Sequence, residues 1–393
     1  MNKPFVKIIR NGPGEKIHRA KTIILNPWHI IENGYVKVEN NIISQVSKEK
    51  IKGTKILDHG SGVLMPGLFN AHIHLELCAF KNKISFNYGF RKWVAELLKQ
   101  RDVTEKKKLK RYAENGLNNV IKSGTLFIGE ISTLGITKNI VKNSDVFGIW
   151  FQEFLGTINQ KTNLIYNLRK KLHFSLAGHG PHTCSPLMLQ KLKQYTKSQS
   201  IPFSIHLAES NDETEFITTK KGKWAEFLKQ RKIDFLKWDI PEKSPVKYLN
   251  KLGILDNKTL AVHLLNTDLN DLEIIAKKDT KPVLCPRSNF NLHKKLPDIS
   301  RMLKLGLKPA LGTDSLASTD TLSIFDEMKF ILENFPDIDP LLIFSMATIN
   351  GAKAFNMEKF AGTIEPGKTG DFIYIPLETN NLKNIFEKVV TYE

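Results

Sequence analysis

Hydrophobic and polar positions divide the chain into three stretches. Residues 1–62 hold short β-rich segments separated by turn pairs such as Asn33-Gly34 and Asn40-Asn41, which is typical of strands joined by tight turns. From residue 63, runs of mainly apolar residues alternate with stretches of helical character, and residues 360–393 return to strand and turn. The apolar runs cover residues 63–74, 125–132, 146–156, 173–180, 202–209, 259–266, 282–289 and 308–315.

The alternation of apolar runs and helices predicts a parallel barrel. Near-continuous apolar strands separated by helices are typical of parallel sheets, whose strands are buried on both faces. Eight such units fit a TIM (β/α)8 barrel, and a doubly wound open sheet is the alternative that fits them less well. Helices are expected over residues 87–122 (more than one), 137–142, 160–171, 185–199, 212–230, 268–277, 298–305, 318–334 and 340–354.

The eight predicted strands complete such a barrel, which leaves no strand position for the terminal segments. We therefore predict an α/β chain in which residues 63–359 form the barrel. Residues 1–62 and 360–393 are expected to join in a small composite β-sandwich.

Composition favours a globular protein of the cytoplasm. The chain has 393 residues, of which 41% are hydrophobic and 25% are charged, and no segment resembles a signal peptide or a membrane span. Its three cysteines, Cys78, Cys184 and Cys285, form no paired pattern, as expected in a reducing compartment. We expect a cytoplasmic protein with no membrane partner.

The formal net charge of +18 raises the question of nucleic-acid binding. The lysines are scattered and no RNA-binding aromatic motif accompanies them, so a solvated lysine-rich surface is the preferred interpretation. No nucleic-acid partner is expected. A positive surface would attract an anionic substrate.

Histidines and acids follow the predicted strands where each strand ends. The active site of a TIM barrel lies at the carboxyl ends of its strands. His72 and His74 end the first run with the alternate spacing that points two side chains the same way. The later runs end in His179 (fourth), His206 and Glu209 (fifth), His263 (sixth) and Asp314 (eighth).

Three imidazoles and one carboxylate are a typical ligand set for Zn²⁺ or Fe²⁺. We predict His72, His74, His206 and Asp314 as ligands of one divalent ion, with Zn²⁺ preferred and Fe²⁺ the alternative. A satisfied polar core is the competing interpretation. No lysine ends the fourth run to bridge a second ion. His263 is expected beside the metal, as a hydrogen-bond donor.

The remaining chemistry needs a proton carrier, because a divalent ion activates water but does not deliver a proton to the leaving group. Glu209 follows His206 by three residues and is the predicted general acid and base; a solvated loop carboxylate is the alternative. Asp314 is expected to carry a second proton. His182 has no assigned role, and a structural role is expected for His18, His29, His59, His173 and His293.

Four motifs resemble those of the amidohydrolase superfamily, in its branch of cytosine-deaminase-like and nucleoside-deaminase-like enzymes. Residues 66–75 resemble its PG-x-x-N-x-H-x-H motif, His206-Leu207-Ala208-Glu209 its HLAE motif, and residues 311–315 its LGTDS motif. Residues 362–371 resemble its GxIxxGxxAD tail, with Gly370 in the usual alanine position. The match spans nearly the whole chain.

The resemblance implies a one-metal barrel enzyme that hydrolytically deaminates an aminated heterocycle. In that chemistry Glu209 protonates a ring nitrogen, His263 orients the attacking water or the tetrahedral intermediate, and Asp314 accepts a proton from the water. Relatives are often homodimers, and the oligomeric state of this chain stays open.

Further stretches bear on the substrate. Residues 178–185 resemble a motif of adenosine-type deaminases acting on S-adenosylhomocysteine and related nucleosides, which implies substrate binding by His179. Residues 74–77 and 285–292 are more similar to the 6-amino-6-deoxyfutalosine deaminases of menaquinone biosynthesis, whose substrate is an adenine nucleoside carrying a benzoate.

Arg287 is a candidate partner for that carboxylate, with a purely structural role equally open. Glu153, which lies near the end of the third run, is expected to face the pocket. The substrate expected is thus a small nucleoside that carries a carboxylate.

Other functions stay open at this point. The alternatives within the branch are deamination of S-adenosylhomocysteine, methylthioadenosine or adenosine, and guanine or triazine-type hydrolysis. An imidazolone ring-opening enzyme and a non-catalytic scaffold that binds nucleic acid are the more distant possibilities.

Overall fold

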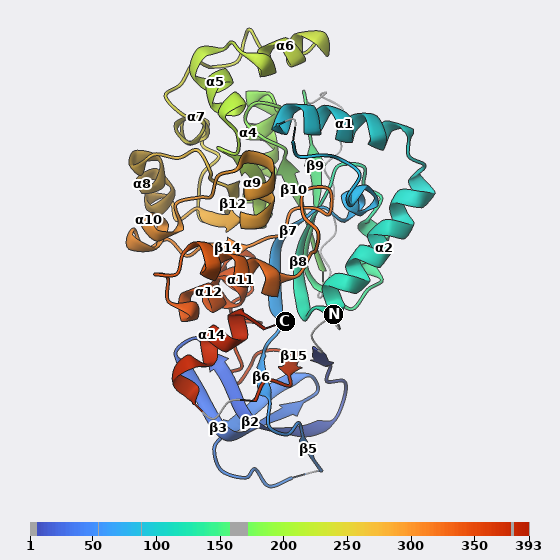
Figure 1. Ribbon diagram of the computed structural model, residues 1–393, viewed down its shortest axis with the longest axis vertical. Helices are drawn as coiled ribbons and strands as arrows, with labels where there is room; N and C mark the ends of the chain where they lie inside the picture. Colours follow the sequence, from blue (N-terminus) through green and yellow to red (C-terminus); the bar gives the residue numbers. More distant parts are fainter. Residues whose placement is uncertain (1–5, 54, 88, 158–171, 379–380, 393) are drawn as a thin grey trace.

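The computed structural model describes residues 6–53, 55–87, 89–157, 172–378 and 381–392, and it contains two sheets. A barrel with its helices occupies one end of the molecule, and a sheet built from both terminal segments occupies the other (Figure 1). The predicted helix over residues 160–171 falls outside the described residues.

All eight apolar runs contribute a strand to one parallel sheet, which confirms the predicted barrel. The order β14-β13-β12-β11-β10-β9-β8-β7 follows the sequence, and a bridge between Ile73 and Asp314 links the two ends of the sheet. The strands are β7 (Leu68–Ile73), β8 (Thr125–Ser132), β9 (Phe147–Phe154), β10 (Leu172–Gly178), β11 (Phe203–Leu207), β12 (Thr259–His263), β13 (Lys281–Leu284) and β14 (Ala310–Leu311).

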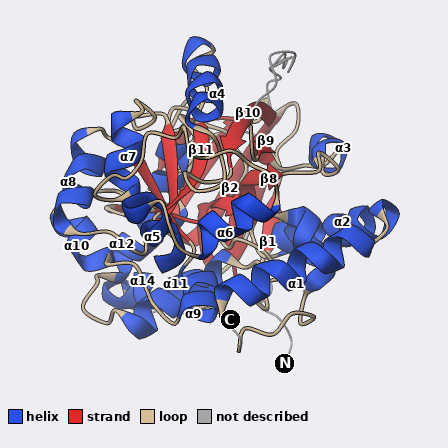
Figure 2. Ribbon diagram, turned by 90° about the horizontal axis from the view of Figure 1, so that it is seen from above, coloured by secondary structure: helices blue, strands red, loops and turns tan. Residues whose placement is uncertain are grey.

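Helices surround these strands (Figure 2). They are α1 (Phe90–Val103), α2 (Lys106–Lys122), α3 (Lys138–Lys142), α4 (Pro186–Ser198), α5 (Asn211–Thr219), α6 (Lys223–Gln230), α7 (Pro245–Lys251), α8 (Leu269–Lys277), α9 (Pro286–His293), α10 (Ile299–Lys304), α11 (Ile324–Asn334), α12 (Pro340–Ala347) and α13 (Ile349–Ala354), with the 3-10 helix η1 (Leu75–Phe80) after β7.

Two of these α-helices, and the 3-10 helix η1, were not predicted. Ser244 caps α7 with its side chain, and Pro245 follows at the first helical position, a combination that favours a helix start. Pro286 likewise begins α9, although Cys285 before it makes no side-chain cap. The strand of the seventh run therefore ends at Leu284 rather than continuing to residue 289.

The terminal sheet has seven strands joined in one hydrogen-bonded sheet. Its strands are β1 (Lys7–Ile9), β2 (Glu15–Asn26), β3 (His29–Glu39), β4 (Ile42–Ser47), β5 (Ile56–Asp58), β6 (Val63–Pro66) and β15 (Phe372–Ile375). Val63–Pro66, predicted as the start of the first barrel strand, pairs here with β15 and β2. Both termini thus contribute to this sheet, as predicted.

The chain then leaves the terminal sheet for α14 (Ile385–Val390), which follows a short 3-10 turn (Leu382–Asn384). Phe386 of α14 packs on Phe344 of α12, with ring centroids 5.3 Å apart. The last described segment therefore packs against the barrel, although we predicted strand and turn there.

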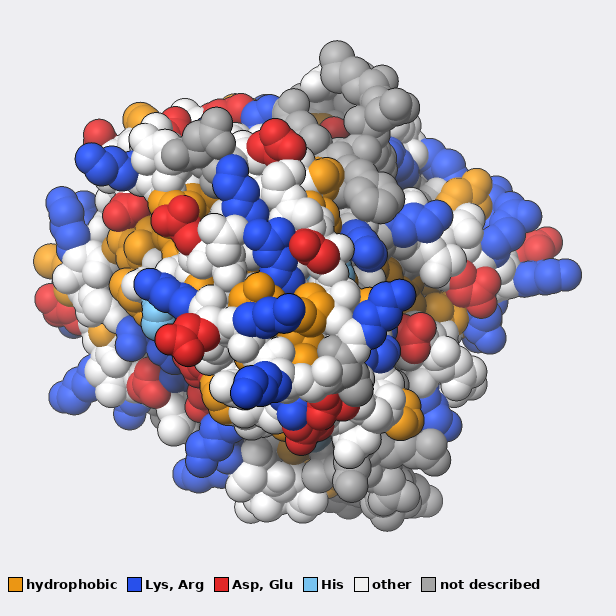
Figure 3. Space-filling model, turned by 90° about the horizontal axis from the view of Figure 1, so that it is seen from below, with side chains coloured by type: hydrophobic (Ala, Val, Ile, Leu, Met, Phe, Trp, Pro, Cys, Tyr) orange, Lys and Arg blue, Asp and Glu red, His pale blue; other side chains and the backbone are white. Residues whose placement is uncertain are grey.

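The barrel core is apolar, and the outer surface is charged. Phe69 and Phe127 stack inside it with ring centroids 4.2 Å apart. On the face drawn in Figure 3, lysines and arginines are dispersed among acidic side chains. Among the described residues, no helix is both long enough and apolar enough to cross a membrane.

Candidate active site

The closure of the barrel brings the first and last strands together at their carboxyl ends. The His74 amide donates to the Asp314 carbonyl (2.8 Å), and the Thr313 amide donates to the His72 carbonyl (3.0 Å). Asn70, from the first motif, donates from its side chain to Thr313 Oγ1 (2.7 Å). Two motifs separated by more than 200 residues are thereby held in one fixed register.

This closure requires a glycine at position 312. A Cβ there would lie 2.8 Å from His72 Cβ and 2.9 Å from the His72 carbonyl oxygen. Any side chain would therefore push the two strands apart, which accounts for the glycine in the 311–315 motif.

Three strand ends also share an unusual backbone conformation. Ala208, His263 and Asp314 have φ angles of 53°, 78° and 59°. Left-handed residues other than glycine carry strain and are enriched at functional sites. The backbone therefore turns sharply at or just after the carboxyl ends of β11, β12 and β14, which carry site residues.

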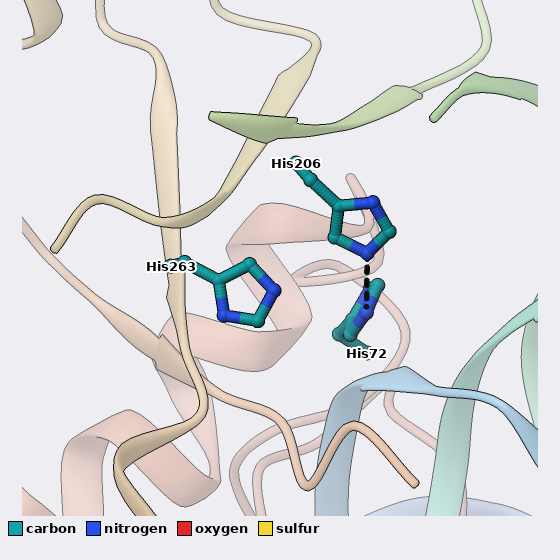
Figure 4. Close-up of side chains that lie close together, drawn as sticks. All are labelled: His72, His206 and His263. Carbon is teal, nitrogen blue, oxygen red and sulfur yellow. Dashed lines mark hydrogen bonds between the residues drawn. The ribbon is translucent and has the colours of Figure 1, made fainter. Parts of the chain in front are cut away.

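Imidazole nitrogens and carboxylate oxygens converge inside this ring of strand ends. His72 Nε2 lies 3.2 Å from His206 Nε2, with His263 beside them (Figure 4). His74 Nε2 lies 3.8 Å from Asp314 Oδ1. Two ligand atoms on a tetrahedral zinc ion lie about 3.3 Å apart, given bond lengths of about 2.0–2.1 Å. The spacing of these atoms is therefore that of a metal site.

Hydrogen bonds from neighbouring groups fix the orientation of His206 and of Asp314. His206 Nδ1 donates to the His179 carbonyl (2.8 Å), and this leaves the lone pair on Nε2 free. Asp314 Oδ2 accepts from the hydroxyls of Ser288 (2.6 Å) and Ser318 (2.9 Å), while Oδ1 faces His74. Such supporting hydrogen bonds are characteristic of metal ligands.

The imidazoles of His72, His74 and His206 are uncharged at neutral pH. Burial, reinforced by neighbouring histidines, lowers the pKa of His74 and of His206 to about 3, and it lowers the pKa of His72 well below its usual 6.5. Neutral imidazole is the form that binds a metal. The ligand atoms of His72, His74 and Asp314 lie within 4.8 Å of one another, and so do those of His72, His206 and His263. His72, His74, His206 and Asp314 are therefore candidates to hold one divalent ion.

Glu209 is held between two histidines. Its Oε1 lies 3.8 Å from His263 Nε2 and 3.4 Å from His293 Nε2. Burial alone would raise the pKa of Glu209, but His263 and His293 outweigh it and hold the pKa well below its usual range. A buried carboxylate is therefore available beside the convergent nitrogens.

His293 was expected to have only a structural role, and the structure places it against Glu209. His293 is the last residue of α9. This helix was not predicted, because residues 282–289 were interpreted as one strand. Asn289 of the same helix also belongs to the site, since its Oδ1 accepts a hydrogen bond from His263 Nδ1 (2.8 Å). The proline at position 286 was the available signal for this helix.

His74, His206, Glu209, His263 and Asp314 form the floor of a cavity of about 400 Å³. His179 and Glu153, both predicted to bind substrate, line it. His179 Nδ1 contacts Thr183 Oγ1 (2.8 Å), and Glu153 Oε2 accepts from Thr133 Oγ1 (2.6 Å). The fully buried His182 also lines the cavity and contacts the ring of Trp224.

Arg287 lies elsewhere. Its guanidinium pairs with Asp320 and donates to Thr321 Oγ1 (3.0 Å), and it does not line the cavity. The physical reason is that residue 287 sits in the first turn of α9, directed toward the acids near α11, and not at a strand end. The arginines that do line the cavity are Arg101 and Arg231.

Comparisons with known proteins identify the family of this chain. Residues 63–391 match the amidohydrolase family. A 5-methylthioadenosine/S-adenosylhomocysteine deaminase of Thermococcus sibiricus is 28% identical over 398 residues, covering 91% of this chain and 87% of that protein.

Solved structures share the fold. Helicobacter pylori aminofutalosine deaminase, in complex with methylthio-coformycin, superposes with a TM-score of 0.81 at 24% identity, covering 96% of this chain and 97% of that one. A zinc-bound adenosine deaminase from Xanthomonas campestris gives 0.78 at 17% identity, covering 97% and 90%. The chain therefore belongs to the amidohydrolase family, as its motifs predicted, and its named relatives support a hydrolytic deaminase.

Proposed function

We propose that this chain is a metal-dependent hydrolytic deaminase of an adenine-type nucleoside. The observation that carries the proposal is the short distance from His72 to His206 and from His74 to Asp314, beside a cavity that His74, His206, Asp314 and Glu209 line. In this assignment the three histidines and Asp314 hold one divalent ion. Zinc is preferred over ferrous iron for this set of nitrogen and oxygen ligands, and the X. campestris adenosine deaminase has bound zinc.

A bound divalent ion would supply a water molecule activated as a nucleophile at neutral pH. Glu209 takes a proton from this water and delivers it to the ring nitrogen next to the amino-bearing carbon, as general base and then general acid. Water adds to that carbon, the C–N bond to the amino group breaks, and ammonia leaves with the second proton of the water.

The neighbours of Glu209 support these roles. His263 is anchored through Nδ1 to Asn289 and presents Nε2 toward the Glu209 carboxylate, so it can orient the attacking oxygen. Asp314 has one oxygen fixed by two serines and the other facing His74, which suits it to accept the second proton. His179 and Glu153 line the same cavity and are proposed to contact the nucleoside.

We propose 6-amino-6-deoxyfutalosine as the substrate, which would place the enzyme in menaquinone biosynthesis. The motifs at residues 74–77 and 285–292 and the fold shared with H. pylori aminofutalosine deaminase support this choice. The T. sibiricus relative, named for 5-methylthioadenosine and S-adenosylhomocysteine, supports these nucleosides as the second candidates. The three cysteines are free and buried, which supports a cytoplasmic setting.

An ammonia-release screen of the zinc-loaded enzyme tests the proposal. The panel contains aminofutalosine, S-adenosylhomocysteine, 5-methylthioadenosine, 5'-deoxyadenosine, adenosine and guanine. We expect release of one ammonia per adenine nucleoside, with the highest kcat/KM for aminofutalosine. Release from guanine alone, or from no compound by a protein with bound metal, would refute the assignment. A preference for another adenine nucleoside would refute the substrate and keep the reaction.

A further inference from the structure

Two helices form apolar walls above the floor of the cavity. α1 and α6 both lie at the end of the barrel opposite the terminal sheet, and the two helices are neighbours when the barrel is seen from above (Figures 1 and 2). Both contribute to the lining of the same cavity. The floor holds imidazoles and carboxylates, so the walls determine what else a ligand can carry.

The cavity-lining residues of each helix form one stripe that ends in an arginine. On α1, the lining residues Phe90, Trp93, Leu97 and Arg101 follow at intervals of three or four. On α6, Trp224, Phe227, Leu228 and then Arg231 repeat the pattern, with Arg231 directly after the last helical residue. Residues spaced in this way share one face of a helix. Each wall is therefore apolar over most of its length and cationic at its end.

The two guanidinium groups are available for a ligand. The only ion pair of Arg101 among the described residues is with its neighbour Asp102, at 3.9 Å, and the Arg101 side chain is 23% exposed. Arg231 lies over the ring of Phe227, 5.0 Å from its centroid. Arg287, by contrast, is occupied by Asp320 and Asp326. No other arginine and no lysine lines the described cavity.

We propose that Arg101 and Arg231 bind an anionic group at the far end of the substrate. The site would then take an elongated nucleoside with its base at the floor, an apolar portion between α1 and α6, and a negative charge beyond it. The inference rests on the proposed function for the position of the base. Carboxylate and phosphate both match the paired donors of a guanidinium.

The experiment measures selectivity. Arg101→Gln and Arg231→Gln, singly and together, are compared with Lys99→Gln, which removes one charge from the exposed face of the same helix. The probes are aminofutalosine (carboxylate), adenosine 5'-monophosphate (phosphate) and 5'-deoxyadenosine (neutral). We expect the ratio of kcat/KM for the preferred anionic probe to that for the neutral one to fall about 10- to 100-fold in each arginine variant.

The loss should be in KM rather than in kcat, because the anionic group takes no part in the reaction and is bound equally in ground and transition states. The Lys99→Gln ratio should equal that of the unmodified enzyme. The anionic probe whose ratio falls most identifies the group as carboxylate or phosphate. An unchanged ratio in the double variant, or an equal fall in Lys99→Gln, would overturn the assignment.

A binding measurement separates this inference from the proposed function. Calorimetry on zinc-loaded Glu209→Gln, with and without Arg101→Gln, gives the affinity of the three probes in the absence of turnover. Selective weakening of the anionic probe supports the arginine assignment even if no nucleoside is deaminated. Equal weakening of all three probes rejects it even if ammonia is released.

Discussion

Two clusters of histidines, one at the floor of the cavity and one in the terminal sheet, differ in the groups that their ring nitrogens face. In the terminal sheet, His18 is 1% exposed; its Nδ1 pairs with His59 Nε2 (2.9 Å) and its Nε2 with Asn11 Oδ1 (2.9 Å). In the cavity, the Nε2 atoms of His72 and His206 face each other across 3.2 Å, beside the carboxylate of Asp314.

Burial and a lowered pKa do not separate the two clusters. Burial is the main cause that lowers the pKa of His18 to about 3, and it does the same for His206. The two clusters differ instead in the hydrogen-bonding partners of their ring nitrogens. The nitrogens of His18 are satisfied by a neighbouring imidazole and an amide, whereas the cavity nitrogens present lone pairs to one another, an arrangement that a cation would relieve.

Because the cavity nitrogens present lone pairs to one another, whereas those of His18 are satisfied, we expect catalysis to depend on the cavity cluster and not on the terminal cluster. The largest fall in kcat is expected for Glu209→Gln. We expect kcat to fall about 10²- to 10⁴-fold, because the amide cannot transfer the proton, while zinc content stays unchanged. His18→Gln should retain full activity. The exposed Glu226→Gln serves as a matched carboxylate control. A fully active Glu209→Gln enzyme would contradict the assignment of the proton carrier.

Metal affinity gives the next effect. Ser318→Ala removes one of the two hydroxyls that orient Asp314, and we expect zinc affinity to fall about 10- to 100-fold. Asp314→Asn should lose both metal and turnover. His59→Gln, in the other cluster, should leave zinc affinity unchanged. Competition with a chromogenic chelator measures the zinc affinity of all three variants. Equal losses of affinity in the variants of the two clusters would contradict the assignment of the metal site to the cavity cluster.

The terminal cluster should instead govern stability against acid. The folded-state pKa of His18 is about 3 against 6.5 for the free residue, so the unfolded chain binds a proton that the folded chain excludes. The stability present above pH 6.5 is lost as the pH falls toward 3, by as much as about 2 kcal/mol for His18 at pH 5.

Denaturant unfolding at pH 7 and pH 5 measures this effect. We expect His18→Gln to shrink the difference in unfolding free energy between the two pH values, and the exposed His29→Gln to leave that difference unchanged. An unaltered difference in His18→Gln would show that this histidine is protonated in the folded protein.

The smallest effect is expected at His293, the histidine that the sequence did not place in the site. Its contact with Glu209 at 3.4 Å is long for a hydrogen bond, so we expect His293→Gln to lower kcat about fivefold. The pH–rate profile should shift as well, because His293 lowers the pKa of Glu209. A profile identical to that of the unmodified enzyme would restore a purely structural role.

Sequence alone predicted the parts of the molecule that repeat or that follow a strand. The eight runs appear as barrel strands because buried parallel strands are apolar throughout, and His72, His74, His206 and Asp314 meet because the barrel must close. The position of Arg287 could not be predicted, since it depends on where a strand yields to a helix. Arg101 and Arg231 were missed because the prediction considered only residues at the ends of strands, whereas these two side chains line the cavity from α1 and from the end of α6.

Anomalous diffraction at the zinc edge, from crystals of the zinc-loaded enzyme, locates the metal ion and its ligands. We predict one peak about 2.0–2.2 Å from nitrogens of His72, His74 and His206 and from an oxygen of Asp314. No peak at the cavity floor, or a peak that lacks two or more of these ligands, would contradict the account.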